Sequence, residues 1–118
     1  MSDIGSSGVR VDTSGEGLTE LLERNGFQLC HDSIVADKTD DIVQAVDAAI
    51  TRDKADLVLT TGGTGVSPSD VTPEAMNQLF DKEIPGIAEA MRAASLLITP
   101  RAVLSRGRAG IRNRSLII

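Results

Sequence analysis

The chain has 118 residues, which predicts one domain with a single core. Its 41% hydrophobic and 25% charged residues are ordinary for a globular protein, and two Phe with no Tyr or Trp disfavour base stacking on aromatic rings. The net charge of −5 further argues against general nucleic-acid binding.

The cysteine content and the hydropathy of the chain indicate a reducing compartment and no membrane-spanning segment. The only cysteine, Cys30, excludes an internal disulfide framework and fits a reducing compartment. No apolar run approaches the roughly 18 residues that a membrane span needs. The N-terminal stretch MSDIGSSG does not have the basic and apolar segments of a secretory signal. We therefore expect a cytoplasmic location.

Charge is unevenly distributed along the chain. Residues 101–118 contain five arginines and no acid, whereas residues 1–100 contain seven basic and all 17 acidic residues. An arginine-rich end can place positive charge beside an anionic ligand. A solvated surface strand or an oligomer contact explains the pattern equally well, so charge alone leaves these alternatives open.

The first half of the chain predicts two helices and one strand. Residues 1–12 are polar and rich in Gly and Ser, which indicates a loop. A helix follows to Asn25, with capping residues at its start and Asn-Gly at its end. The alternating run FQLCHDSIV predicts a strand at 27–35, and apolar residues then recur at helical spacing over 37–50.

The second half continues this alternation. The short apolar run at 55–61 is typical of a central parallel strand buried on both faces. Thr-Pro-Glu starts a helix over 72–80, and Pro-Gly starts another over 87–98. The rest predicts strands at 102–105 and 115–118, joined by a Gly/Arg/Asn turn.

Helices alternating with strands favour one α/β domain over 1–118, with helices on both faces of the sheet. The chain begins in a predicted loop and stops on Leu-Ile-Ile, in the middle of an apolar strand. Because natural domains rarely leave such an edge uncovered, we expect terminal pieces of the domain to be absent from this sequence.

The segment TTGGTGVSPSD at 60–70 follows the predicted central strand. Ligands of open α/β sheets bind beyond the carboxyl ends of strands, and glycines let backbone N–H groups approach a phosphate closely. The candidate ligand-binding residues here are Thr61, Gly62, Gly63, Thr64, Gly65 and Ser67. The spacing fits neither a P-loop nor GxGxxG, so a tight structural turn remains the alternative.

Two acids follow predicted strand ends. Asp37 follows the strand at 27–35, and Asp70 follows the glycines. Two carboxylates beside a phosphate-binding loop suit Mg²⁺ held between protein and substrate oxygens. The alternatives are a helix cap for Asp37 and a turn former for Asp70.

Four ordered motifs resemble the molybdopterin-binding family, which includes the bacterial Mog and MoaB proteins and the G domains of plant Cnx1 and gephyrin. These motifs are TTGGTG, SPSDVTPEA (67–75), KEIPGIAEAMR (82–92) and LSRGRAGIRNRSLII (104–118). VDTSG (11–15) and IVAD (34–37) also match. The likeness spans nearly the whole chain, and its DVTPEA version is closer to the Mog branch.

The resemblance implies a three-layer α/β/α fold with a mostly parallel central sheet, assembled as a homotrimer. It implies molybdopterin adenylyltransferase activity, in which molybdopterin and Mg·ATP give adenylyl-molybdopterin and pyrophosphate. A molybdenum insertase would receive the product. The alternative is a MoaB-like protein that binds molybdopterin or a precursor without turnover, and a nucleotide-linked activity like that of competence-damage proteins is a third.

The resemblance also places site residues. The family's key acids, as catalytic and metal-binding groups, match Asp37 and Asp70, and Ser115 matches a region that lines the pterin site. In the adenylylation hypothesis, one or more of Arg106, Arg108 and Arg112 offset the developing negative charge. Relatives have an apolar first strand and a loop after the last strand that this sequence does not contain.

Overall fold

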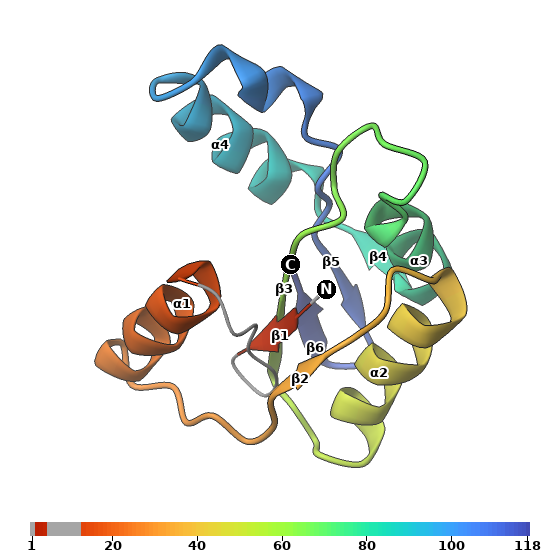
Figure 1. Cartoon of the computed structure of the whole chain (residues 1–118). Helices are drawn as coiled ribbons and strands as arrows, with labels where there is room; N and C mark the ends of the chain where they lie inside the picture. The colour runs from red at the N-terminus through yellow and green to blue at the C-terminus, as the bar shows by residue number, and fades with distance from the viewer. Residues whose placement is uncertain (1, 5–12) are drawn as a thin grey trace.

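The computed structural model describes residues 2–4 and 13–118. Figure 1 shows helices arranged around a twisted sheet. In chain order the elements are β1 Ser2–Ile4, α1 Thr13–Arg24, β2 Ser33–Ile34, α2 Thr39–Thr51, β3 Leu57–Thr61, α3 Thr72–Leu79, β4 Lys82–Glu83, α4 Pro85–Leu96, the 3₁₀ helix η1 Pro100–Leu104, β5 Gly110–Arg112 and β6 Ser115–Ile117.

The sheet has the strand order β2-β1-β3-β6-β5-β4. Within the described residues, β3 and β6 pair in parallel, whereas the other four neighbouring pairs are antiparallel. The α/β class is therefore confirmed, but the sheet is mixed rather than mostly parallel. One of these antiparallel pairs has a local cause, because β5 and β6 form a hairpin, and Asn113 in its turn has a φ of 55°.

Strand directions bring several strand ends to one edge of the sheet. β2, β3 and β6 all run the same way, because β1 is antiparallel to both of its neighbours and β6 is parallel to β3. The segment before β5 reaches this edge too, because β5 is antiparallel to β6. We call this end of the sheet, where β2, β3 and β6 finish and β5 begins, the carboxyl edge. The glycine segment, Asp37 and residues 105–109 therefore lie toward the same edge.

The core lies between one face of the sheet and helices α2 and α3, which pack against each other (Figure 1). Its fully buried large side chains are Ile42, Val46, Val58, Met76, Leu79 and Ile117. Each such side chain stabilises the fold by about 1.5–3 kcal/mol through removal of apolar surface from water. The core thereby fixes β3 and β6, the strands that end at the carboxyl edge.

Helix α4 and η1 form a separate unit that extends from the carboxyl edge, away from α2 (Figure 1). They pack on each other, yet their outer surface is apolar and exposed. The exposed side chains there include Leu96, Leu97, Ile98, Val103 and Leu104, which we call the α4–η1 apolar surface. Within the described ranges, no helix is long and apolar enough to cross a membrane.

Three predictions from the sequence are wrong in the described residues. The predicted strand at 27–35 shrinks to β2, and the predicted strand at 102–105 is part of η1, which begins at a proline. Within the predicted loop at 1–12, residues Ser2–Ile4 form β1, and the rest of that prediction lies outside the described residues. The predicted helices are confirmed with boundary shifts of a few residues.

Gly110 provides a test of packing between β5 and the end of α3. A Cβ atom added there would lie 2.6 Å from Phe80 Cγ and 2.7 Å from the Lys82 carbonyl oxygen. We expect Gly110→Ala to lower the free energy of unfolding by about 1–3 kcal/mol, measured by urea denaturation. Gly86→Ala is the control, because no atom lies within 4 Å of a Cβ there. Equal stability of the two variants would contradict the prediction.

Candidate functional site

A turn built on two glycines follows β3. Gly62 and Gly63 have φ values of 93° and 70°, a backbone region that residues with a Cβ rarely adopt. The buried Thr72 fastens this turn to α3, because its Oγ1 donates to Gly62 O at 3.0 Å and its N–H donates to Gly63 O at 3.1 Å. Thr72 is the first residue of α3, and Val71 is the N-cap of this helix.

The two predicted acids adjoin the glycines of this loop. A Cβ atom on Gly65 would lie 2.7 Å from Asp70 Oδ2, and one on Gly63 would lie 3.7 Å from Asp37 Oδ1. Asp70 Oδ2 also accepts from Ser67 N–H at 3.0 Å, so Asp70 forms the turn that the sequence offered as its alternative role. The structure therefore brings both carboxylates against the loop.

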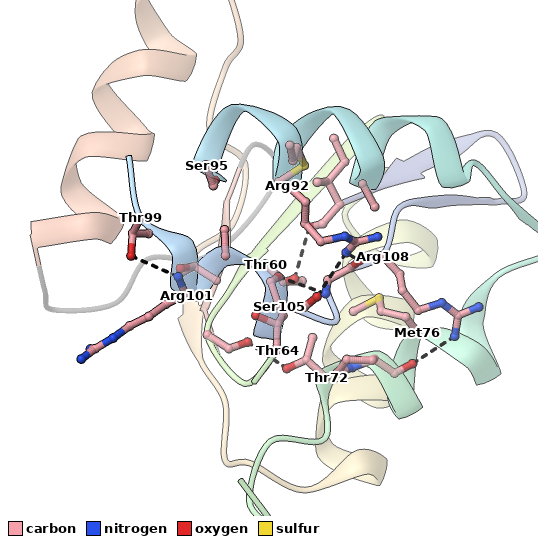
Figure 2. A pocket seen from close by; sticks show the side chains of 18 residues that line it. Thr60, Thr64, Thr72, Met76, Arg92, Ser95, Thr99, Arg101, Ser105 and Arg108 are labelled. Carbon is pink, nitrogen blue, oxygen red and sulfur yellow. Dashed lines mark hydrogen bonds between the residues drawn. The ribbon is translucent and has the colours of Figure 1, made fainter. Parts of the chain in front are cut away.

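A pocket of about 430 Å³ opens beside the loop (Figure 2). Its walls come from the end of β3, the start of α3, helix α4 and η1. Figure 2 shows Arg92 and Ser95 on α4, across the hollow from Thr72. The lining contains no Asp or Glu among the described residues, but it includes the arginines at 92, 101 and 108. A pocket of this composition suits an anionic ligand.

The loop alternates between these two environments. Gly62 and Thr64 line the pocket, whereas Gly63 and Gly65 adjoin the carboxylates of Asp37 and Asp70. Thr60 and Thr61 also line the pocket. One short segment thus adjoins both an arginine-bearing pocket and two acids.

Helix α4 contributes residues that the sequence reasoning missed. Ala88, Arg92 and Ser95 of α4 line the pocket at intervals of three or four residues, and Thr99, the N-cap of η1, continues the lining beyond the end of the helix. The spacing within α4 places its three residues on one helical face, with a short polar stripe of Arg and Ser. The stripe was visible in the sequence, but nothing there showed that α4 faces the glycine loop.

Arg106, predicted to bind the ligand, is bound to protein groups instead. Its guanidinium donates to Gly65 O and Asp70 O at 2.8 Å each, and it forms a two-point pair with Glu74 at 2.7 and 3.2 Å. The hydrogen bonds that Arg106 donates to Glu74 lower the pKa of the Glu74 carboxyl. The ionised Glu74 therefore stabilises the fold at pH values above the ordinary pKa of this group. The contribution is lost as the pH falls through the lowered pKa.

The other two arginines of this segment differ in position. Arg108 reaches the pocket wall, pairs with Glu83 at 2.6 Å and lies 5.3 Å from the centroid of the Phe80 ring. Hydrogen bonds from Arg108 lower the pKa of the Glu83 carboxyl. Arg112 lies at the hairpin end of β5, away from the carboxyl edge, and pairs with Asp47 at 3.1 Å.

Ser115 and Ser67 are two further predicted residues that do not line the pocket. Ser115 is at the start of β6, hence at the edge opposite the glycine loop, and its buried hydroxyl donates to Ala55 O. The structure therefore does not bring Ser115 to the site. Ser67 is exposed, and its hydroxyl lies 3.2 Å from that of Ser69, on the segment that carries Asp70.

The acids fit a metal shared with a ligand better than a cage built by the protein. Within the described residues, no group of three or more His, Cys, Asp or Glu side chains could hold a metal ion. Mg²⁺ is commonly held by one or two carboxylates together with substrate phosphates. Asp37 and Asp70, both against a glycine loop, match that smaller requirement.

Comparison with known proteins gives a consistent family. The model of a family described as "Probable molybdopterin binding domain" matches residues 1–118. A molybdopterin adenylyltransferase of Helicobacter pylori (strain J99) is 45% identical over 120 residues, which are 99% of this chain and 68% of that protein. The molybdenum cofactor biosynthesis protein B of Bacillus cereus is 43% identical over 109 residues, which are 91% of this chain and 64% of that protein.

A solved structure supports the same assignment. The crystal structure of a molybdopterin biosynthesis protein from Mycobacterium abscessus is similar to this fold with a TM-score of 0.85 and 45% sequence identity. The match covers 92% of this chain and 68% of that chain. Both the resemblance read from the motifs and the Mog/MoaB-like fold are thereby confirmed. The chain belongs to the molybdopterin-binding domain family.

Proposed function

We propose that this protein binds molybdopterin and adenylylates it with Mg·ATP, releasing pyrophosphate, as a step in molybdenum cofactor biosynthesis. The observation that carries this proposal is the 45% identity with the Helicobacter pylori molybdopterin adenylyltransferase over 99% of this chain. The glycine loop, which adjoins two acids and an arginine-bearing pocket, supplies a site of suitable chemistry.

In this proposal the pocket and the acids beside the loop bind different parts of the substrates. The pocket between the loop and α4 receives the pterin, and its volume of about 430 Å³ is in the range of small-molecule sites. Loop N–H groups bind phosphate oxygens. Arg92 and Arg108 add positive charge along the pocket wall.

The reaction needs no protein nucleophile. A phosphate oxygen of molybdopterin attacks the α-phosphorus of ATP, the bond from that phosphorus to the bridging oxygen breaks, and pyrophosphate leaves with the electron pair. Such phosphoryl chemistry depends on positioning and on charge neutralisation. Cys30, the single cysteine, is exposed, and this reaction does not require it as a nucleophile.

The acids of the loop provide the ionic part of the site. Asp37 and Asp70 would hold Mg²⁺ together with the phosphates of ATP, which lowers the repulsion between the reacting anions. We also propose that the product is passed to a molybdenum insertase, a step that depends on the adenylylation itself. A cytoplasmic location stays a prediction.

A second candidate function is binding of molybdopterin, or of a precursor, without turnover. The similarity to the Bacillus cereus protein B, 43% identical over 91% of this chain, favours it nearly as well. Both functions use the same pocket and loop. They differ in whether pyrophosphate is released.

We also propose that the protein assembles as a homotrimer through the α4–η1 apolar surface. Leu97 and Ile98 are 90% and 89% exposed, and Leu96, Val103 and Leu104 nearby in the chain are exposed as well. Large exposed apolar patches mark interaction sites on monomeric structures. Burial of these side chains in an assembly would remove them from water.

The first test of function is pyrophosphate release from Mg·ATP on addition of molybdopterin. We expect the parent protein to release pyrophosphate, and Asp70→Asn to lose at least about 100-fold in rate, a typical loss when a charge-stabilising group is removed. Asp81→Asn is the matched control. Like Asp70, Asp81 accepts one backbone N–H, but it does so at the hairpin end of the sheet, from Asn113 at 2.7 Å.

The outcomes separate the candidate functions. Release by the parent and Asp81→Asn but not by Asp70→Asn supports adenylylation at the loop. Molybdopterin binding by the parent without pyrophosphate release supports the binding function. An Asp70→Asn variant as active as the parent would refute the role of this carboxylate.

Assembly is tested by the mass in solution. We expect the parent to sediment as a trimer of the 12.4 kDa chain, and Leu97→Asp to shift it to monomers because the charge disfavours burial of the surface. Leu21→Asp, at an exposed position of α1, should leave the assembly intact. A monomeric parent would contradict the trimer, and a trimeric Leu97→Asp variant would contradict this surface as its contact.

A further inference from the structure

Arg106 binds three carbonyl groups of the segment that follows the glycine turn. Arg106 donates through Nε to Gly65 O at 2.8 Å, through Nη2 to Asp70 O at 2.8 Å, and through its backbone N–H to Thr64 O at 2.7 Å. These three carbonyls belong to a segment with no regular secondary structure. The segment therefore takes much of its shape from a residue about 40 positions away in the chain.

Holding a carbonyl also directs the amide in the same peptide plane. In a trans peptide the C=O and N–H bonds are coplanar and point in opposite directions. The carbonyls of Thr64 and Gly65 share their planes with the N–H groups of Gly65 and Val66. Both N–H groups are consequently directed away from Arg106. Among the described residues, neither of them donates a hydrogen bond to another protein group.

We propose that Arg106 is a positioning residue, which holds the carbonyls of residues 64–70 so that the loop N–H groups face a phosphate, and which does not itself bind the ligand. This inference rests on the proposed function, because that function supplies the phosphate. It replaces the ligand-binding role that the sequence indicated for Arg106.

The guanidinium has little capacity left for a ligand. An arginine side chain has five N–H donors, and four hydrogen bonds to protein groups already use four of them. Glu74, in the first turn of α3, takes two of these bonds and so orients the fork. Because this pair is exposed, its main effect is on geometry rather than on stability.

A second arginine fixes the segment that carries Arg106. Arg92 Nη1, from α4, donates to Gly107 O at 2.7 Å and to Ser105 O at 3.4 Å, on either side of Arg106. The contacts therefore run from α4 to residues 105–107 and from there to the loop. Arg106 is held at its backbone by one element and holds another through its side chain.

The test compares Arg106→Lys and Arg106→Gln with Arg112→Gln. Arg112 is the matched control, because it also binds a carboxylate and a carbonyl, on Asp47 and Leu79, at the far end of β5. The first readout is backbone hydrogen exchange in peptides covering residues 61–72, which include the hydrogen-bonded N–H groups of Ser67, Asp70 and Thr72. The second is pyrophosphate release at varied Mg·ATP.

We expect exchange in residues 61–72 to accelerate about tenfold or more in both Arg106 variants, with no such change in Arg112→Gln. KM for Mg·ATP should rise in both as well. Lysine keeps the charge but cannot form the fork, so it should not rescue. If Arg106→Gln does not fold, Arg106→Lys carries the test.

Two results would overturn the inference. Full activity of Arg106→Lys would show that charge alone matters. Loss of activity in the Arg106 variants with unchanged loop exchange would show that Arg106 acts on the ligand directly. If no variant and not even the parent releases pyrophosphate, the proposed function fails, while the exchange measurement still decides whether Arg106 positions the loop.

Discussion

The parallel pairing of β3 with β6 determines where everything else in the site lies. Val58 and Ile117, paired in this ladder, are both fully buried against α2 and α3, so the two strands cannot slip without exposing the core. Their carboxyl ends therefore coincide. Because β5 returns antiparallel to β6, the chain that precedes it must arrive at the same edge, beside the loop that leaves β3. Core packing thus brings residues 105–109 to the glycines.

The uneven charge of the sequence has an internal explanation in this arrangement. Arginines at 106, 108 and 112 pair with Glu74, Glu83 and Asp47, all in the acidic first 100 residues. The arginine-rich end is therefore largely a set of cross-links to the body of the domain. Of these three paired arginines only Arg108 lines the pocket, where Arg101 of the same end of the chain also lies.

The sequence predicted local features well and spatial relations less well. Helical periodicity and the Pro-containing starts found α2, α3 and α4, because these signals are local. The apolar run after Pro100 was indistinguishable from a strand, although it packs on α4 as η1. The loop and both acids were identified correctly as neighbours, since they follow strands that end at one edge. Ser115 was assigned through the family resemblance, and the structure places it at the start of β6, at the edge opposite the loop, so its role in the site stays a prediction.

The loop combines two opposing physical requirements. Glycines at 62 and 63 allow the left-handed turn, but glycine loses more conformational freedom on folding than any other residue. A flexible loop would present its N–H groups in many directions, and phosphoryl transfer depends on positioning. Side chains outside the loop resolve this conflict: Thr72 binds the carbonyls of the turn, and Arg106 binds those that follow. The glycines thus let the backbone approach an anion, and hydrogen bonds from Thr72 and Arg106 remove the conformational freedom that the glycines add.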